Sequence, residues 1–237
     1  MTETNLALQA NNISVTYHSR TGLFKSFKFQ ALNNVSFKVK RGETFGVMGR
    51  NGCGKSSLLR VLAGVYQADA GELVTHDIAT RTLLTLGLGF DATLSGADNA
   101  ILSMMLQGFS REEAKAYLPA VRNFSELGDF FERPVKTYSS GMRSRLGFST
   151  GITTQTDLLL IDETLAVGDK TFNAKAEKAM MERIDSDQTV IFVSHSGAQV
   201  QKICQRAICL ERGKLVAEGD VKDVAQEYAN INDKKLD

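Results

Sequence analysis

Cysteine is scarce in this chain, which has three cysteines, Cys53, Cys204 and Cys209, among 237 residues. Three scattered cysteines are too few for a disulfide framework, and the lack of a CxxC pair or a His/Cys cluster argues against a zinc site. This cysteine usage favours a reducing, cytoplasmic compartment.

Net charge and long apolar runs are lacking as well. The 28 Lys and Arg residues balance 27 Asp and Glu residues to a net charge of +1, so bulk charge indicates neither nucleic acid nor an anionic surface as a partner. The polar N-terminus carries no signal-peptide pattern, and the longest apolar runs, such as 190–193, have the length of a strand. We therefore expect a chain that does not span a membrane by itself. Its length allows one large α/β domain or a core with a subdomain.

The most informative segment is 49–57, Gly-Arg-Asn-Gly-Cys-Gly-Lys-Ser-Ser, which fits the phosphate-binding pattern G-x-x-x-x-G-K-[ST] at every fixed position. It follows an apolar run at 44–48 that suits a buried parallel strand, and it leads into a helical pattern at 56–63. Glycines let backbone N–H groups approach phosphate oxygens, and a helix N-terminus favours the same anion. We predict a nucleoside triphosphate site made by Gly49, Asn51, Gly52, Cys53, Gly54, Lys55, Ser56 and Ser57.

Two side chains of this segment have distinct predicted roles. Lys55 is expected to reach the β- and γ-phosphates, and the Ser56 hydroxyl is expected to ligate Mg²⁺. A thiol reagent at Cys53 should block nucleotide binding, unless Cys53 is a small buried residue that no reagent reaches. The alternative for the whole segment is a glycine-rich turn that binds nothing.

Polar residues end two further strand-like runs, 157–163 and 188–195. Asp162 is predicted to help hold Mg²⁺, and Glu163 to orient and deprotonate the water that attacks the γ-phosphate. His195 is predicted to hydrogen-bond the γ-phosphate or that water, because ligands collect at strand ends in open α/β sheets. The alternatives are helix caps for the carboxylates and a plain polar strand end for the histidine.

The rest of the pattern divides into strands near the N-terminus and helices in the middle. Alternating apolar residues predict strands at 6–17 and 31–39, and phenylalanines and lysines interleave between them at 22–29. That segment is either a short strand or turn with a solvated lysine face, or a membrane-surface contact. Helical periodicity from about 94 to 155 predicts a helical subdomain inserted between two halves of an α/β nucleotide-binding core.

The stretch 137–143, Thr-Tyr-Ser-Ser-Gly-Met-Arg, completes a set of motifs in which the chain resembles the ATP-binding subunits of ABC transporters over nearly its whole length. In that family a Leu-Ser-Gly-Gly-Gln signature begins a helix and contacts the γ-phosphate bound by the opposite subunit. The matching stretch here keeps Ser139 and Gly141 and departs at three positions. The resemblance implies that Ser139, Ser140 and Gly141 contact nucleotide.

The same resemblance implies roles for residues that lie elsewhere in the chain. Tyr17 is similar to the aromatic residue that stacks on adenine, and 165–169 to the loop that couples the two subunits. His195 is similar to the family's switch histidine. Asp91 stands where the family usually has a glutamine that senses Mg²⁺ and the transporter, and is a further candidate metal ligand.

Three shorter motifs resemble one subgroup, the exporters of bacterial surface polysaccharides, which move capsule, O-antigen or teichoic-acid chains, usually lipid-linked, across the inner membrane. They are Ser-Glu-Leu-Gly at 125–128, Tyr-Ser-Ser-Gly-Met at 138–142 and Ala-Val-Gly-Asp at 166–169. The implied fold is a single ABC ATPase domain over 1–237. It has an α/β phosphate-loop NTPase core, a helical subdomain at roughly 94–155 and an N-terminal antiparallel β portion. The end at Asp237 is expected to leave no room for the C-terminal carbohydrate-binding domain that some members add.

The implied cofactors are ATP and Mg²⁺, and the implied partners are a second copy of the chain and an integral-membrane subunit docked around 91–105. The polysaccharide would mainly touch that subunit, at the cytoplasmic face of the inner membrane, and no nucleic acid is expected. Three rivals are an ABC ATPase for another transported substrate, a soluble ABC ATPase and a phosphate-loop kinase of small molecules. A soluble ABC ATPase would normally carry a coiled coil or two fused cassettes, whereas the sequence shows neither heptads nor an internal repeat. For a kinase, 139–142 would be an accidental helix cap.

Overall fold

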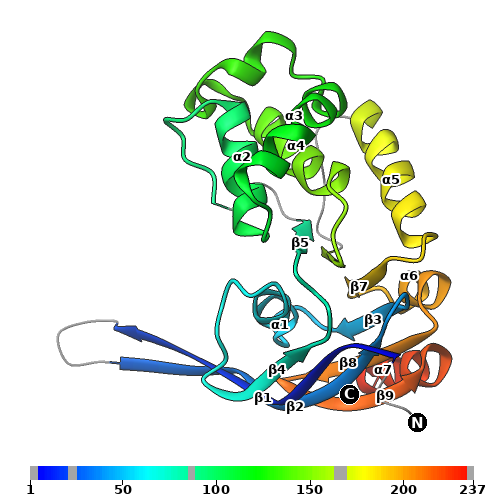
Figure 1. Ribbon diagram of the computed structural model, residues 1–237. Coiled ribbons are helices and arrows are strands. Elements are labelled where there is room, and N and C mark those ends of the chain that lie inside the picture. Colours follow the sequence, from blue (N-terminus) through cyan, green and yellow to red (C-terminus); the bar gives the residue numbers. More distant parts are fainter. Residues whose placement is uncertain (1–4, 21–25, 85–88, 163–169, 234–237) are drawn as a thin grey trace. The chain divides into compact units, whose positions relative to one another are not determined.

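The computed structural model describes residues 5–20, 26–84, 89–162 and 170–233. Its chain forms two compact units, one made of Met1–Ile78 with Asp187–Asp237 and the other of Ala79–Ser186. Each unit has strands and helices of its own (Figure 1).

The first unit contains an antiparallel sheet with strand order β2-β1-β4. Its strands are β1 (Leu6–Arg20), β2 (Ser26–Lys40) and β4 (Ala70–Thr75). The predicted N-terminal antiparallel portion is therefore present, and its hairpin is longer than the two predicted strands. The ladder continues through the pairs Tyr17 with Phe29 and Ser19 with Phe27, so the segment beyond Tyr17 is strand as well.

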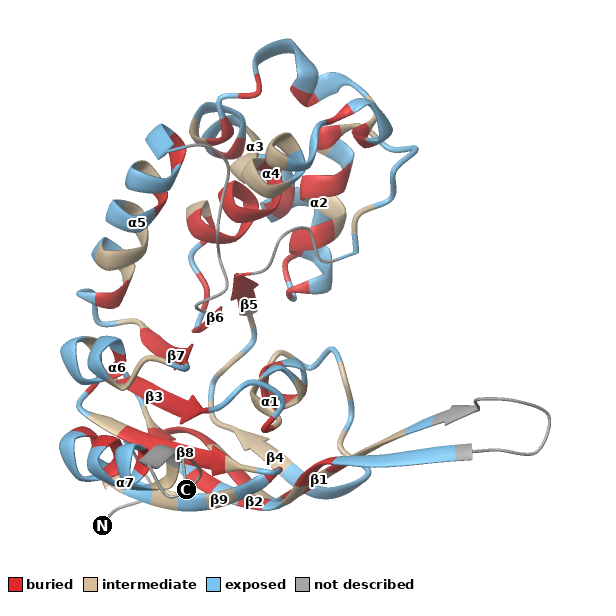
Figure 2. Ribbon diagram, turned by 180° about the vertical axis from the view of Figure 1, so that it is seen from behind, coloured by how far each residue is buried: buried red, intermediate tan, exposed pale blue. Residues whose placement is uncertain are grey.

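The first unit also holds four strands in the order β7-β3-β8-β9. They are β3 (Thr44–Gly49), β7 (Thr189–Ser194), β8 (Arg206–Glu211) and β9 (Lys214–Asp220). β3 pairs in parallel with β7 and β8, while β9 closes an antiparallel hairpin with β8. Nearly continuous apolar runs suit strands covered on both faces, and β3, β7 and most of β8 are buried (Figure 2). The helices of this unit are α1 (Lys55–Leu62), α6 (Gly197–Ile203) and α7 (Val221–Asp233).

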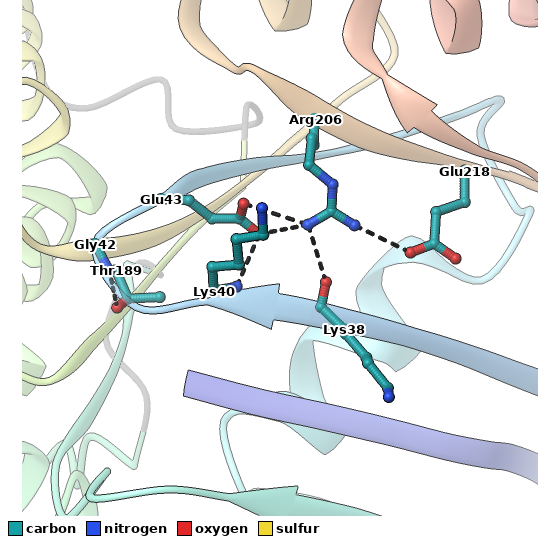
Figure 3. Close-up of polar contacts among 7 residues, drawn as sticks. All are labelled: Lys38, Lys40, Gly42, Glu43, Thr189, Arg206 and Glu218. Atoms are coloured by element: carbon teal, nitrogen blue, oxygen red, sulfur yellow. Dashed lines mark hydrogen bonds and ion pairs between the residues drawn. The ribbon is translucent and has the colours of Figure 1, made fainter. Parts of the chain in front are cut away.

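A charged cluster joins the two sheets of the first unit (Figure 3). Arg206 of β8 donates to the Glu43 carboxylate at 3.0 Å, to the Glu218 carboxylate at 3.2 Å and to the backbone oxygen of Lys38 at 3.4 Å. Glu43 also accepts from the backbone N–H of Lys40 at 2.9 Å. One guanidinium thus connects β2, the turn before β3, β8 and β9. No local sequence pattern predicted this cluster, because the residues that contact Arg206 are far apart in the chain.

The second unit pairs two short parallel strands, β5 (Arg81–Leu84) and β6 (Leu158–Asp162), in the register Leu83 with Leu160. Its α-helices are α2 (Gly96–Leu106), α3 (Arg111–Ser125), α4 (Ser140–Thr153) and α5 (Lys170–Ile184). Two single 3-10 turns, η2 (Gly128–Glu132) and η3 (Val135–Thr137), lead into α4.

An apolar core holds α2, α3 and α4 together around fully buried Met104, Val121 and Leu146. Met104 is core filler, as methionines in a helical pattern most often are. All three helices begin and end inside the predicted helical segment 94–155. The compact unit is larger than that segment, because β5, β6 and α5 belong to it. The boundary of a helical subdomain at 94 and 155 stays a prediction.

Candidate nucleotide site

The phosphate loop runs from the end of β3 at Gly49 to the start of α1 at Lys55. Gly52 and Gly54 have φ values of 80° and 113°, in the left-handed region that residues with a Cβ rarely adopt. A Cβ at Gly54 would also collide with the backbone oxygen of Ala31, whereas a Cβ at Gly52 would meet nothing within 4 Å. Gly54 is therefore required by the packing of the loop against β2, and Gly52 by the turn alone.

The N-terminus of α1 presents groups suited to an anion. Gly54 caps the helix without a side-chain hydrogen bond, and the first turn carries no acidic residue. Ser56 is exposed there. Lys55 donates from Nζ to the backbone oxygens of Gly49 and, at 3.0 Å, of Arg50, so its ammonium lies over the loop. A helix N-terminus with a lysine above the same turn is an anion-binding arrangement.

The turn between β8 and β9 supports the loop from the protein side, a role that sequence reasoning missed. Gly213 in this turn donates its N–H to the Cys53 oxygen at 2.8 Å and accepts from the Asn33 N–H at 2.8 Å. Arg212 and Gly213 have φ values of 47° and 78°, which is the pattern of a two-residue type I′ hairpin. The Arg-Gly pair between strand-like runs could have revealed the turn, but not its position against the phosphate loop. A pocket of about 280 Å³ lies beside this contact.

Cys53 is buried, with 5% of its surface exposed, and a Cβ on Gly49 would meet its Sγ. Burial raises the pKa of the Cys53 thiol above its ordinary value, although the nearby Lys55 ammonium acts in the opposite direction. A protonated, enclosed thiol reacts slowly. The geometry agrees with the second alternative, a small buried residue that reagents do not reach. Its side chain points into the protein, so Cys53 belongs to the loop through its backbone.

Tyr17 of β1 contacts the first turn of α1, directly after the phosphate loop. Its hydroxyl lies 3.1 Å from the Ser57 hydroxyl, and its ring packs against Tyr66 with the ring centroids 5.7 Å apart. The phenol is half-exposed and fixed at both ends. Stacking of this ring on adenine stays a prediction. Neither the hydrogen bond nor Tyr66 was expected from the sequence.

His195 lies at the same sheet edge as the phosphate loop. β3 and β7 are parallel with Met48 opposite Ser194, so Gly49 and His195 leave the sheet side by side. Tyr228 of α7 donates to the backbone oxygen of His195 at 3.0 Å, while the histidine itself is exposed. The structure therefore brings residue 195 to the strand end beside the loop, while a contact of its imidazole with the γ-phosphate or the attacking water stays a prediction.

The second unit carries the remaining described candidates. Asp162 is the last residue of β6, half-buried after four buried aliphatic residues. Ser139 caps α4, its hydroxyl accepting from the Met142 N–H at 3.1 Å, and exposed Ser140 and half-buried Gly141 follow in the first turn. The first turn of α4 has no acidic residue, so its positive end faces outward without a carboxylate.

Asp91 lies in the segment that precedes α2, where it forms a local turn. Its carboxylate accepts from the N–H and the hydroxyl of Thr93, at 2.7 and 2.6 Å, while Asn99 accepts the Asp91 N–H. The hydrogen bonds from Thr93 hold the pKa of the exposed Asp91 carboxyl below its usual value. The carboxylate is thus ionised, with Oδ1 already used in the turn. Glu163 and the segment 165–169 lie outside the described residues.

The family model for "ABC transporter" matches residues 32–166. The chain belongs to this family. The match contains the phosphate loop, Asp162, the turn of Asp91 and the first turn of α4.

Two ABC relatives show which branch of the family this chain is similar to. It is 42% identical over 188 residues to the O-antigen export system ATP-binding protein RfbE of Yersinia enterocolitica, covering 79% of this chain and 78% of that protein. It is 40% identical over 212 residues to the teichoic acids export ATP-binding protein TagH of Listeria innocua, covering 87% of this chain and 63% of that protein. The match to the TagH protein of Bacillus cereus covers 36% of the length of that protein.

Solved ABC cassettes have the same fold. A dimeric ATP-binding cassette in a post-hydrolysis state, bound to ADP and Pi, matches with a TM-score of 0.69 at 21% identity, covering 90% of this chain and 98% of that one. An ATP-binding subunit of an ABC transporter matches with a TM-score of 0.70 at 18% identity, covering 94% and 93%. The predicted fold class, an ABC-type α/β core, is confirmed. Among the described helices of this ABC chain, none is long and apolar enough to cross a membrane.

Proposed function

We propose that the chain binds and hydrolyses ATP as the nucleotide-binding subunit of an exporter of lipid-linked surface polysaccharide, such as O-antigen, capsule or teichoic acid. The observation that carries the ATP site is the loop from Gly49 to Lys55, with left-handed glycines, a helix N-terminus that lacks a side-chain cap and a lysine ammonium above it. Backbone amides and this ammonium are complementary to a triphosphate. The polysaccharide class is supported by relatives at about 40% identity that are named for O-antigen and teichoic acid export.

The phosphate loop would hold ATP by its backbone and by three side chains. Lys55 is proposed to exchange its contacts with loop carbonyls for the β- and γ-phosphates, because charged oxygens are better acceptors than neutral ones. Asn51 is exposed at the loop and available to the phosphates. Tyr17, held by Ser57, would stack on adenine.

The residues predicted to hold Mg²⁺ have the oxygen donors that this ion prefers. Ser56 offers an exposed hydroxyl in the first turn of α1, and Asp162 offers a carboxylate at the end of β6. Asp91 is a weaker candidate, since Thr93 occupies its Oδ1. When bound, Mg²⁺ would neutralise charge that develops on the phosphates.

Hydrolysis needs a general base and a group that hydrogen-bonds the γ-phosphate or the attacking water. Glu163, one residue after Asp162, is proposed to orient the attacking water and accept its proton. His195 is proposed to hydrogen-bond the γ-phosphate or that water, because the parallel register of β3 and β7 brings it to the loop's edge of the sheet.

A second copy of the chain would complete each site. Ser139, Ser140 and Gly141 start α4 with an exposed hydroxyl-bearing turn and no acidic residue, which suits the γ-phosphate of ATP bound by the other copy. Nucleotide would then be the ligand that shifts two copies from open to closed, and hydrolysis would release them.

The helical part of the second unit offers an apolar face for an integral-membrane subunit. Met105 and Leu106 at the end of α2 are exposed, at 45% and 58%, and Leu94 just before α2 is exposed as well. Leu94 and Met105 lie within the predicted docking segment 91–105, and Leu106 directly follows it. Docking there would hold the chain at the cytoplasmic face of the inner membrane, and the polysaccharide would contact mainly the membrane subunit.

The rival functions are less well supported. A small-molecule kinase would need the phosphate loop but no second phosphate-binding helix start at Ser139, and the family match to ABC transporters argues against a kinase. A soluble ABC ATPase, or a transporter for another substrate, would share the nucleotide site and differ only in its partner. No nucleic acid is proposed as a ligand, because the chain as a whole carries a net charge of only +1.

The test is ATP hydrolysis by the purified chain and by Glu163→Gln, with size-exclusion chromatography of both in ATP and Mg²⁺. We expect the wild type to release phosphate and Glu163→Gln to lose activity by about a hundredfold or more, as the loss of a general base does. The variant should also elute as a dimer in ATP only. Glu177→Gln on the exposed face of α5 is the matched control and should behave as wild type. Full activity of Glu163→Gln would reject the assigned base, and transfer of phosphate to an acceptor would support the kinase.

A further inference from the structure

The hairpin of β1 and β2 exposes aromatic side chains near its end. Phe27 and Phe29 are 56% and 43% exposed, and the residues between and after them, Lys28 and Gln30, are exposed too. In an ordinary edge hairpin one face is covered, whereas four consecutive exposed residues mean that neither face is covered here. Figure 1 shows this part of the hairpin extending beyond the other strands of its unit.

The two faces of this hairpin end differ in chemistry. Successive residues of a strand point to opposite faces, and directly paired residues of neighbouring strands share a face. Phe29 is paired with Tyr17, and Phe27 lies two residues further along on the same face. Lys28 is paired with exposed His18 on the other face. One face therefore carries the two aromatic rings, and the other carries the Lys28 ammonium beside His18.

The charge of this part of the chain is of one sign. From residue 4 to residue 42 there is no Asp or Glu, while Arg20, Lys25, Lys28, Lys38, Lys40 and Arg41 are basic. Since the net charge of the whole chain is +1, the other residues together are acidic. The near-neutral total conceals a basic segment that includes the aromatic hairpin end.

We propose that this hairpin end, residues 27–30 with His18, binds the surface of an anionic phospholipid bilayer. Aromatic rings enter the boundary between head groups and acyl chains, and Lys or Arg residues beside them are attracted to acidic head groups. Both kinds of side chain, aromatic and basic, are exposed at Phe27, Lys28 and Phe29 of β2. A lipid surface fits better than a protein groove, because it accepts an aromatic and a cationic face at once without a shaped pocket.

The proposal goes beyond the transporter function, in which only the membrane subunit has to contact lipid. It gives the ATPase chain a second attachment to the bilayer, from the first unit. Among the alternatives that the sequence left open for the segment 22–29, it selects the membrane-surface contact over a solvated strand.

The chain has no tryptophan, so Phe27→Trp provides a single fluorescent reporter at the hairpin end. The purified variant is mixed, without nucleotide, with vesicles of phosphatidylcholine containing phosphatidylglycerol, or with vesicles of phosphatidylcholine alone. We expect a blue shift and quenching by brominated acyl chains with the anionic vesicles only, reversed by high salt. Val216→Trp, at an exposed apolar position on β9, is the control reporter and should not respond.

Co-sedimentation of unlabelled protein with the same vesicles tests the residues. Phe27→Ser with Phe29→Ser, and separately Lys28→Glu, should each weaken binding by about tenfold or more. Lys222→Glu, exposed on α7, removes the same charge elsewhere and should not weaken it comparably. Thermal unfolding of every variant checks that it folds.

Several results would overturn the proposal. A silent Phe27→Trp reporter with anionic vesicles would do so, as would equal binding to vesicles of phosphatidylcholine alone. A reporter that responds only when a membrane protein is present in the vesicles would replace the lipid by a protein partner. Because no nucleotide is used, these outcomes are independent of the ATP hydrolysis test, and either proposal can fail while the other stands.

Discussion

Gly52 and Gly54 of the phosphate loop allow the cost of a left-handed backbone to be measured apart from the cost of a steric collision. Both adopt left-handed φ values, but only at Gly54 would a Cβ strike backbone, the oxygen of Ala31. Gly52→Ala should therefore lower the free energy of unfolding by about 1 kcal/mol, the cost of the left-handed conformation. Gly54→Ala should cost about 3 kcal/mol, since overpacking against β2 is added. Urea unfolding without nucleotide measures both, and equal losses would contradict the described packing of the loop.

Tyr138, just before the helix α4, links stability to alkaline pH. Its buried hydroxyl donates to the Phe130 oxygen, and burial raises its pKa from 10.0 to about 12, with a smaller effect of Glu132. The neutral phenol is favoured in the folded state, so its contribution is complete below pH 10.0 and is lost as the pH rises to about 12.

Tyr138→Phe tests this linkage. It should lower the free energy of unfolding at neutral pH by about 1 kcal/mol, the net worth of one hydrogen bond. Between pH 10.0 and 12 the variant should lose less stability than the wild type. Buried Cys204 and Cys209, whose pKa values are also raised to about 12, add the same alkaline loss to both proteins and cancel in the difference. Parallel pH dependence of the two proteins would contradict the assignment.

At the scale of the element, Ser139 has a structural and a proposed ligand role that can be measured apart. Its hydroxyl caps α4, so Ser139→Ala should cost about 1 kcal/mol of stability. Ser139→Asp keeps a cap and should retain stability, but its negative charge would repel the γ-phosphate and abolish the ATP-dependent dimer.

Ser110→Ala is the matched control for this cap. Ser110 forms a capping box with Glu113 at the start of α3, so the substitution should cost a similar amount of stability and leave dimerisation intact. If Ser139→Asp still dimerises in ATP, the helix start is a cap only. Thermal unfolding and size-exclusion chromatography in ATP give the two readouts, with each substitution made in the Glu163→Gln background in which the dimer should persist.

Elements whose signals are local could be predicted from the sequence. Gly49–Ser57 contains its own turn, glycines and helix start, and the structure has the strand, loop and helix at the expected places. The hairpin β1–β2 was predicted too short, since the residues directly after Tyr17 are all polar, although Ser26–Gln30 alternate and fit either a short strand or a turn. Pairing between the strands extends the ladder to Arg20 and Ser26, and the sequence of one strand does not specify how far it pairs with the other.

Contacts between distant segments explain most of what could not be predicted. The Arg206 cluster joins residues up to 168 positions apart, and the Gly213 turn supports a loop 160 residues earlier in the chain. That His195 follows a strand beside the phosphate loop could be predicted from one rule, that parallel strands end at a common edge, while its role at the phosphate stays a prediction. The hydrogen-bond partners of these site residues, Tyr228 for His195 and Ser57 for Tyr17, could not be predicted, because composition and spacing contain no signal for them.

For the molecule as a whole, the proposed site residues are divided between the two compact units. The phosphate loop and His195 belong to the first, and Asp162 and the start of α4 belong to the second. If two copies bind ATP between them, each copy would contribute its phosphate loop to one ATP and the start of its α4 to the other. Stability in nucleotide should then depend on protein concentration, because anything that binds only the folded dimer shifts unfolding by mass action.

Glu163→Gln is the variant in which this dependence is measurable, because ATP would persist. In Mg²⁺ and ATP its melting temperature should rise with protein concentration, whereas without nucleotide it should stay constant. Adding Ser139→Asp to this variant should keep a melting shift from ATP, since the phosphate loop is intact, but remove the concentration dependence. A shift that is the same at all protein concentrations would mean that ATP binds one copy alone. The proposed closure of two copies would then be wrong, while the phosphate loop would remain a nucleotide site.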